Sequence, residues 1–518
     1  MNARILLACI VALLTLLRWT WNAPHEMSPE EAYLALCGRS PAPAYFEGPP
    51  GTALCVALGV AVAGPSDLGA ALAWPVFAAL ATLALYLLVA PLRGSRAALA
   101  LAVLLNLLPA FNLATLAPGA AMPVTMFALA FMACAWRALD RGAPGWWLLA
   151  GFCAAGALLF AYGSWFLVPS LALVLLASHR WRRHLVASAF WLAALPPLAV
   201  LAALFLWNAR HGWVHFIGGT WQTALAIHWS HILPGLASAA FAVSPLVLVA
   251  VAAGFVSCLR DIRVAPKAKF LAVPALAALA VAGYAVLTGC PSVVAGLAAS
   301  ALALPLLAWL PAGISPHQHR ARNWQDRSAQ LLRDTPASPL FLPAVFLTAA
   351  FASFAAIART APPANPVSGA VVLEVEALRA AQSAEQPVFL IAENAALAAA
   401  LSLHLRDTAS VAAGHPPVYV VESPFADSQY ALWPRYDQFL DAPPASPQDD
   451  NEDPFTEQDG ANPFLGRSAL YITWQAVDDL PQAVTAAFAA HRLQAEITTP
   501  SGAVLRVFLC EDYQTLPL

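Results

Sequence analysis

The sequence predicts a polytopic α-helical membrane protein that carries an α/β domain at its C-terminal end. Hydrophobic residues make up 60% of the 518 residues and charged residues only 11%, whereas a soluble domain is roughly one quarter charged. Apolar runs of about twenty residues, each long enough to cross a bilayer, recur through residues 1–357. The net charge of -3 argues against a nucleic-acid partner.

The positions of Lys and Arg predict the topology, because these residues accumulate in cytoplasmic loops. Clusters of Lys and Arg alternate along the chain with loops that hold few cations. This alternation predicts about eleven transmembrane helices, with the N-terminus in the cytoplasm and the C-terminus outside. The predicted spans are residues 4–21, 68–90, 97–115, 123–139, 146–160, 163–178, 185–207, 233–257, 270–288, 292–311 and 339–357.

Two further segments of this part need separate interpretation. The first apolar run lacks a small-residue cleavage site near its end, so we expect a retained helix rather than a removed signal peptide. Residues 51–63 are apolar but too short to cross a bilayer, which predicts an interfacial or re-entrant helix. Together these segments place loop 22–67 on the outer face.

After residue 357 the character of the sequence changes. Short apolar runs at residues 387–392, 417–421, 469–474 and 503–509 predict strands, and residues 394–405 and 482–493 predict helices. We therefore expect residues 358–518 to form an extracytoplasmic α/β domain. The acidic, proline-rich stretch at 441–463 predicts a flexible surface loop. Residues 1–357 are expected to form the transmembrane domain, with the candidate site in its outer loop 22–67.

Acidic residues are unusually dense in that outer loop. Ser28 followed by Pro29 and, three residues on, Glu31 predicts a capping box at a helix start, which gives Glu31 a structural role. Glu30 points about 100° away around the helix and capping does not explain it. A carboxylate just above the bilayer could act as a general base toward an acceptor hydroxyl or amine.

A second acid follows in the stretch YFEGPP at residues 45–50, where two prolines stiffen the chain beside Glu47. This rigid turn is typical of a sugar-binding or metal-binding loop, and equally of an ordinary turn at a membrane interface. The outer loop 208–232 adds His211, His215, His228 and His231. With Glu30 and Glu47 these histidines could hold a divalent ion, or they could serve as interface anchors.

Several functions are disfavoured. The sequence contains no glycine-rich phosphate loop or dinucleotide fingerprint, which argues against ATP-driven transport by this chain. Ionisable residues are nearly absent from the predicted spans, with Arg18 as the exception. Ion-coupled transporters usually need such residues within the membrane.

Four stretches together resemble a known class of proteins. They are Glu30–Tyr33 (EEAY), Tyr45–Pro50 (YFEGPP), Trp207–Trp213 (WNARHGW) and Ser428–Trp433 (SQYALW). In content, order and spacing they are similar to bacterial membrane glycosyltransferases of the GT-C class, above all the protein-mannosyltransferase-like and aminoarabinose-transferase-like groups. The resemblance implies a GT-C-like fold and a multi-pass protein of the bacterial inner membrane.

The resemblance also implies an activity. A sugar would move from a polyprenyl-phosphate donor to a glycan, lipid or protein acceptor at the outer face, with inversion at the anomeric carbon. Glu30 would be the catalytic base, and Glu47 would help to arrange the site, with a divalent metal ion as an optional cofactor. The candidate substrate-binding residues are Glu31, Tyr33, Tyr45, Arg39, Arg210 and His211.

The chain departs from the class at several motif positions. Glu30 replaces the usual Asp, Gly48 replaces a basic residue, and Ala161 replaces a Lys. The usual Thr-Pro-Asp of the next outer loop reads Ala117-Pro118-Gly119. Two alternatives therefore stay open beside the enzyme. One is a catalytically degenerate scaffold that binds a lipid-linked glycan or a partner protein, and the other is a lipid or glycan transporter.

Overall fold

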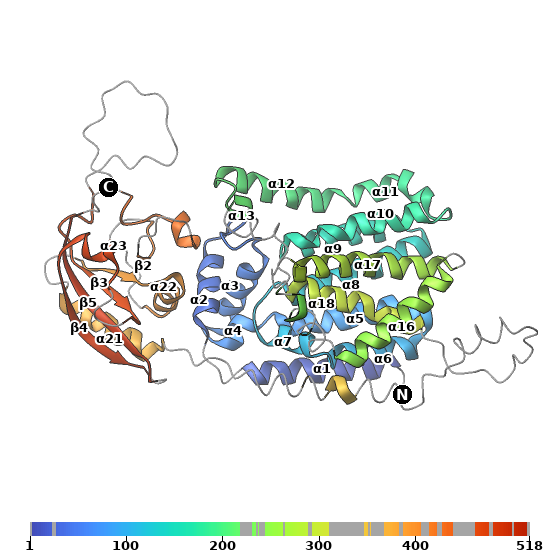
Figure 1. Cartoon of the computed structure of the whole chain (residues 1–518), viewed down its shortest axis with the longest axis horizontal. Helices are drawn as coiled ribbons and strands as arrows, with labels where there is room; N and C mark the ends of the chain where they lie inside the picture. The colour runs from blue at the N-terminus through green and yellow to red at the C-terminus, as the bar shows by residue number, and fades with distance from the viewer. Residues whose placement is uncertain are drawn as a thin grey trace, which may run out of the picture. The chain divides into compact units, whose positions relative to one another are not determined.

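The computed structural model describes most of the chain and divides it into two compact units (Figure 1). The described residues are 3–514 without the segments 23–26, 218–229, 231, 235–236, 238–243, 263–264, 288–292, 310–346, 351–352, 354–366, 383–386, 406–413, 422–426, 439–461, 476–479 and 500–501. The first unit comprises residues 1–23, 48–52 and 71–361. The second comprises residues 24–47, 53–70 and 362–518.

The first unit is helical. Its longer helices are α1 (Ala3–Asn22), α5 (Trp74–Arg93), α6 (Ser95–Asn106), α7 (Pro109–Leu116), α8 (Ala121–Arg141), α9 (Pro144–Leu158), α10 (Leu167–Ala177), α12 (Leu195–Arg210), α16 (Pro245–Asp261), α17 (Pro266–Leu287) and α18 (Val293–Ala303). Shorter elements are η1 (Tyr162–Phe166), η2 (Arg182–Val186), α11 (Ser188–Leu192), α13 (Val214–Ile217) and η3 (Leu304–Trp309). Most predicted spans therefore coincide with a helix or with a run of consecutive helices.

Within the described residues, five helices are long and apolar enough to cross a membrane, or six if one bent pair counts as a span. The chain is thus a polytopic helical membrane protein, while the count of about eleven spans stays a prediction. The bent pair is α6 and α7, which meet at 60° where a single span was predicted over residues 97–115. Pro109 explains the break, because proline lacks the amide hydrogen that would continue the helix.

Small residues allow the helices of this unit to approach closely. A Cβ atom at Gly151 of α9 would lie 2.1 Å from the carbonyl oxygen of Ala193, and one at Gly156 would lie 2.4 Å from the Phe127 ring. Both distances are far below van der Waals contact: a side chain at Gly151 would clash with backbone, and one at Gly156 would force the Phe127 ring to move. Close backbone approach through small residues is typical of helix packing in membranes, where apolar burial alone does not drive association.

Arg18, predicted near the outer end of the first span, lies buried in a polar network. Its Nη2 atom donates to the side-chain oxygens of Asn106 and Asn112, each at 3.0 Å. Its guanidinium carbon lies 5.6 Å from the centroid of the Phe111 ring. Asn106 in turn donates to the hydroxyl of Thr82 at 2.9 Å. Neutral amides thus solvate a charge that would otherwise be costly at this depth.

The second unit joins the helices between residues 24 and 70 to the C-terminal part of the chain. Its helices are α2 (Pro29–Arg39), α3 (Gly51–Ala63), α4 (Asp67–Ala71), α21 (Gly369–Gln382), α22 (Ala395–His404), η4 (Gln429–Leu432) and α23 (Gln482–Thr485). Helix α2 packs against α22. It also packs tightly on α3, since a Cβ atom at Gly38 would lie 2.2 Å from the carbonyl oxygen of Ala53.

The sheet of this unit is mixed. Its strands are β1 (Phe389–Ala392), β2 (Val418–Val420), β3 (Ala469–Thr473), β4 (Phe488–Thr498) and β5 (Val504–Tyr513), in the order β2-β1-β3-β5-β4. β1 runs parallel to β2 and β3, whereas β5 runs antiparallel to β3 and β4. Aromatic side chains, among them Phe389, Tyr471 and Phe508, fill the core on this sheet. The predicted α/β character and all four predicted strands are confirmed.

One predicted element was wrong. Residues 482–493 were expected to form a helix, but α23 ends at Thr485 and β4 begins at Phe488. The Ala-rich stretch favours a helix locally. Pairing with β5 prevails, because β4 matches its partner from Phe488 to Thr498 and strand formation depends mostly on such neighbours.

Candidate functional site

The first turn of α2 is shaped by a capping box. Ser28 is the N-cap, and its hydroxyl accepts a hydrogen bond from the backbone N–H of Glu31 at 3.3 Å. The Glu31 carboxylate accepts one from the backbone N–H of Ser28 at 2.8 Å. These reciprocal bonds satisfy donors that a helix start otherwise leaves unpaired. The predicted capping role of Glu31 is confirmed.

Glu31 has a second contact that the sequence did not indicate. Its carboxyl group hydrogen-bonds that of Asp67 at the start of α4. Both residues are only 8% exposed. Burial raises the pKa of Glu31 to about 7, and the negative charge of Asp67 adds to the shift. Burial likewise raises the pKa of Asp67, because two buried carboxyl groups that contact each other cannot both ionise cheaply.

Glu30 has the opposite surroundings. It is exposed, although it neighbours Glu31 in the same first turn. The unpaired N–H groups and dipole of a helix start stabilise an anion at this position. The side chain is therefore a solvent-accessible carboxylate on a helix that the capping box fixes in place.

Glu47 belongs to a network that joins three segments of the second unit. The Tyr33 hydroxyl donates to the Glu47 carboxylate and accepts the backbone N–H of Gln429 at 2.7 Å. The Gln429 side-chain oxygen accepts the backbone N–H of Phe46 at 2.8 Å. The Tyr33 ring also stacks on Tyr430, with centroids 6.3 Å apart. Three of the four motif stretches thus meet at one place.

The electrostatics of this network follow from its surroundings. Glu47 as a residue is exposed, yet the protein around its carboxyl group displaces enough water to raise the pKa. The hydrogen bond from Tyr33 opposes that shift. Burial raises the pKa of the Tyr33 phenol, so the phenol stays neutral and remains a donor. Glu47 is therefore held in one orientation by a neutral partner.

Two other predicted residues of this unit differ in burial. Tyr45 is buried, and its hydroxyl donates to the carbonyl of Ser40 at 3.2 Å and accepts the N–H of Ala42 at 3.3 Å. It thereby closes the turn between α2 and Glu47. Arg39 is exposed in the last turn of α2, where a cation suits the negative end of the helix dipole.

Arg210 and His211 lie in the first unit, at the C-terminal end of α12. His211 stacks on Trp207 with ring centroids 4.2 Å apart, and its Nδ1 atom lies 2.8 Å from the carbonyl oxygen of Trp207. Arg210 is exposed. Trp207 also stacks on His215, with centroids 5.0 Å apart. The end of this helix therefore presents a cation beside a stacked aromatic surface.

A polar contact completes the end of α12. The Tyr162 hydroxyl lies 2.7 Å from Nδ1 of His215, and Asn208 donates to the same hydroxyl at 3.1 Å. Asn208 is fully buried. Neither Tyr162 nor Asn208 was predicted as part of a site. The WNARHGW stretch contained the signal for Asn208, since a buried amide next to aromatic residues needs a partner.

The metal hypothesis gains no support from the described residues. Nowhere among them do three His, Cys, Asp or Glu side chains gather in an arrangement that could hold a metal ion. His228 and His231, which the sequence suggested as ligands, lie outside the described residues.

Comparisons with known proteins agree with the motifs. The sequence profile of the family described as "Dolichyl-phosphate-mannose-protein mannosyltransferase" matches residues 47–207. That stretch includes Glu47, Tyr162 and Trp207 and begins after Glu30. By sequence alone, no curated protein matches the chain.

Solved structures resemble the chain over nearly its whole length. The crystal structure of ArnT from Cupriavidus metallidurans bound to undecaprenyl phosphate has a TM-score of 0.59 and 14% sequence identity, and the match covers 97% of both chains. The oligosaccharyltransferase AglB from Archaeoglobus fulgidus, in complex with an inhibitory peptide and a dolichol-phosphate, has a TM-score of 0.51 and 14% identity. That match covers 97% of this chain and 74% of AglB. The chain therefore has an ArnT-like fold, and the predicted resemblance to GT-C glycosyltransferases is confirmed.

Proposed function

We propose that this chain is a glycosyltransferase that moves a sugar from a polyprenyl-phosphate donor to an acceptor at the outer face of the bacterial inner membrane. The family match and the shared fold support the class of enzyme. The solved relatives supply the donor chemistry, since one is bound to undecaprenyl phosphate and another to a dolichol-phosphate.

One observation carries the proposal furthest. Tyr33, Glu47 and Gln429 come from three separate motif stretches and form one hydrogen-bonded network. A fold alone does not require these stretches to meet around a carboxylate. Groups held by fixed hydrogen bonds are pre-organised, which is what a catalytic arrangement needs.

In the proposed reaction Glu30 is the general base. The acceptor hydroxyl or amine loses its proton to the Glu30 carboxylate as its oxygen or nitrogen attacks the anomeric carbon. The bond from that carbon to the phosphate oxygen breaks, and its electron pair leaves with the polyprenyl phosphate. Attack opposite the leaving group inverts the anomeric configuration. General-base catalysis of this kind contributes about 10²–10⁴ in rate.

Other residues would position the reactants. Glu47, held by Tyr33, would accept hydrogen bonds from sugar or acceptor hydroxyls. Glu31 and Tyr45 would be positioning residues: their hydrogen bonds fix the conformation of the loop that carries Glu30 and Glu47. Arg39 would contact the donor phosphate or sugar. For Arg210 and the stacked His211, which belong to the first unit, the same role is proposed from the resemblance alone.

A degenerate scaffold is the second candidate, and the backbone at Gly48 favours it. Gly48 has a φ of 141°, a conformation that L-residues rarely adopt. A basic side chain at this position would therefore strain the turn. A single substitution of Gly48 by Lys or Arg would therefore restore the cation only at the expense of backbone strain.

Native mass spectrometry of the detergent-purified full chain, offered undecaprenyl-phosphate sugars together with lipid, glycan and peptide acceptors, would test the proposal. We expect wild-type protein and the control Glu374→Gln, which removes an exposed carboxylate on α21, to bind the sugar-carrying lipid and release undecaprenyl phosphate. Glu30→Gln should bind the same lipid without converting it. Binding without turnover in all three proteins would favour the scaffold, and no binding of any polyprenyl phosphate would contradict both candidates.

A further inference from the structure

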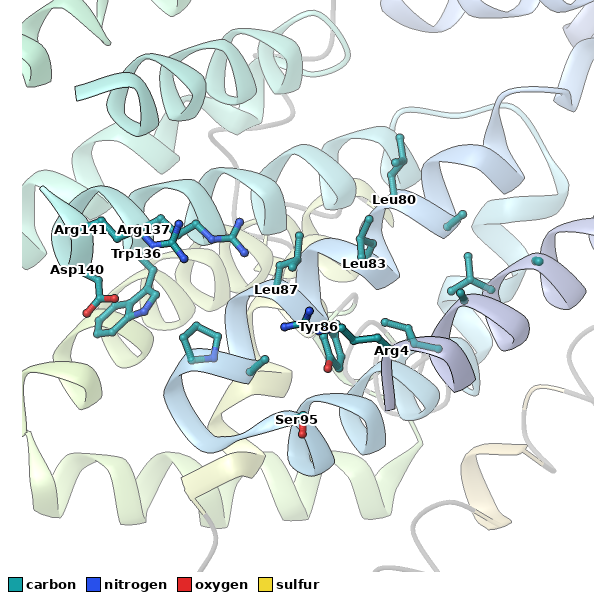
Figure 2. Close-up of a pocket in the computed structure, with 17 residues that line it drawn as sticks. Arg4, Leu80, Leu83, Tyr86, Leu87, Ser95, Trp136, Arg137, Asp140 and Arg141 are labelled. Carbon is teal, nitrogen blue, oxygen red and sulfur yellow. The ribbon is translucent and has the colours of Figure 1, made fainter. Parts of the chain in front are cut away.

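A large pocket lies in the first unit, between α1, α5, α6 and α8 (Figure 2). Its volume is about 1160 Å³, which exceeds the roughly 300–1,000 Å³ of ordinary small-molecule sites. Leu80, Leu83 and Leu87 form one wall along α5. Their spacing places them on one helix face. Leu80 and Leu83 remain more than 40% exposed, so this wall is apolar and open.

One end of the pocket carries charge. Arg137 and Arg141 are four residues apart on α8 and so lie on the same face, and both line the pocket together with Arg4 of α1. Asp140 is the one acid in the lining. Across the described residues, Asp140 forms no ion pair with either Arg137 or Arg141. Three cations against one acid leave this rim positive.

The rim is partly pre-organised. Arg137 is half-buried, and its guanidinium carbon lies 4.9 Å from the centroid of the Trp146 ring. A cation–π contact of this kind fixes the side chain while leaving its charge uncompensated. An anion that reaches the rim would therefore meet a guanidinium that is already oriented.

The pocket is separate from the ends of the helices that face the outer loops. Arg4 and Asn22 lie near opposite ends of α1, roughly 27 Å apart along its axis. The positive-inside rule places the Arg4 end, and the loop after Arg141, at the cytoplasmic face. The anionic lipids of that leaflet attract basic groups at the membrane surface, and basic pockets between helices bind their head groups.

We infer that this pocket binds an anionic phospholipid of the bilayer, with the phosphate at Arg137 and Arg141 and an acyl chain along the leucine wall of α5. The apolar wall on membrane-length helices excludes a free phosphate as the main occupant. A zwitterionic lipid fits less well, because only Asp140 is available to receive its ammonium group. The inference concerns a different part of the chain from the proposed transfer site and stands without it.

The test is native mass spectrometry of the delipidated full chain titrated with phosphatidylglycerol and, separately, with phosphatidylethanolamine. Wild type should bind phosphatidylglycerol more tightly. The double variant Arg137→Gln/Arg141→Gln should bind it roughly tenfold more weakly or worse, with little change toward phosphatidylethanolamine. Arg260→Gln is the matched control, since Arg260 is an exposed cation at the end of α16 and does not line the pocket.

A second variant keeps the result decisive if the double variant does not fold. Leu83→Trp leaves every cation in place and fills the wall, so it should lower the occupancy of both lipids. Unchanged phosphatidylglycerol binding in Leu83→Trp would overturn the inference. Three other results would also overturn it. The first is equal phosphatidylglycerol binding by Arg260→Gln and a folded double variant, and the second is equal binding of the two lipids by wild type. The third is a preference of wild type for undecaprenyl phosphate or inorganic phosphate over phosphatidylglycerol.

Discussion

The loop site of the second unit and the pocket of the first unit handle charge in opposite ways. Around Glu47, hydrogen bonds from Tyr33 and Gln429 fix each polar group individually. In the pocket an apolar wall lies beside arginines, and Arg137 is oriented by the face of the Trp146 ring. Directional hydrogen bonds suit a catalytic site, because a misplacement of about 1 Å can lower the reaction rate strongly. Positive charge beside an apolar surface suits the binding of a flexible lipid instead.

The largest effect that separates the two regions is expected at Glu30. Glu30→Gln should lower the rate of sugar transfer by about 10²–10⁴, because the base is lost, and Glu30→Asp should recover part of the rate. Phosphatidylglycerol binding should not change in either variant. Single-turnover release of polyprenyl phosphate measures the first quantity, and lipid titration measures the second. A Glu30→Gln rate equal to wild type would remove Glu30 from the chemistry.

A smaller effect is expected at Tyr33. Tyr33→Phe leaves the Glu47 carboxylate and the Gln429 N–H without their shared partner, so transfer should slow by roughly ten- to a hundredfold, mostly in kcat. Tyr419→Phe is the control, because its buried hydroxyl has no hydrogen-bond partner among the residues that the structure describes. Equal rates in the two variants would mean that the network serves packing only.

The smallest effect concerns stability and pH at Glu31. Its folded pKa of about 7 lies above the ordinary value of 4.5, so ionisation opposes folding. The cost is absent below about pH 4.5, grows as the pH rises, and levels off above 7, at about 3 kcal/mol. Glu31→Gln keeps the cap and should flatten the pH dependence of Tm between pH 5 and 8. If the Tm of Glu31→Gln fell with rising pH as much as that of wild type, the raised pKa of Glu31 would not be the cause of the pH dependence.

Local patterns predicted the parts of the site that local sequence controls. Ser28 and Glu31 are three residues apart, and their capping box needs nothing else. Apolar length likewise predicted most helices of the first unit, and alternating short runs predicted four strands.

The remaining features depend on partners that are distant along the chain. Gln429 bonds Tyr33 across 396 positions, and Asp67 meets Glu31 only because α4 returns to α2. Nothing within either stretch encodes these contacts. The change from helix to strand at Phe488 has the same origin, since β5 supplies the bonds that override an Ala-rich preference.

Gln429 makes two hydrogen bonds in the network: its backbone N–H donates to Tyr33, and its side-chain oxygen accepts from Phe46. These bonds limit how segments can be exchanged between proteins of this fold. A chimera that exchanges only the residues after 361 with a relative would replace Gln429 while keeping Tyr33 and Phe46. The crossover would cut through the network instead of beside it. Exchanging residues 24–47 together with the C-terminal part keeps every hydrogen-bond donor and acceptor of the network from the same parent. A functional chimera would need this.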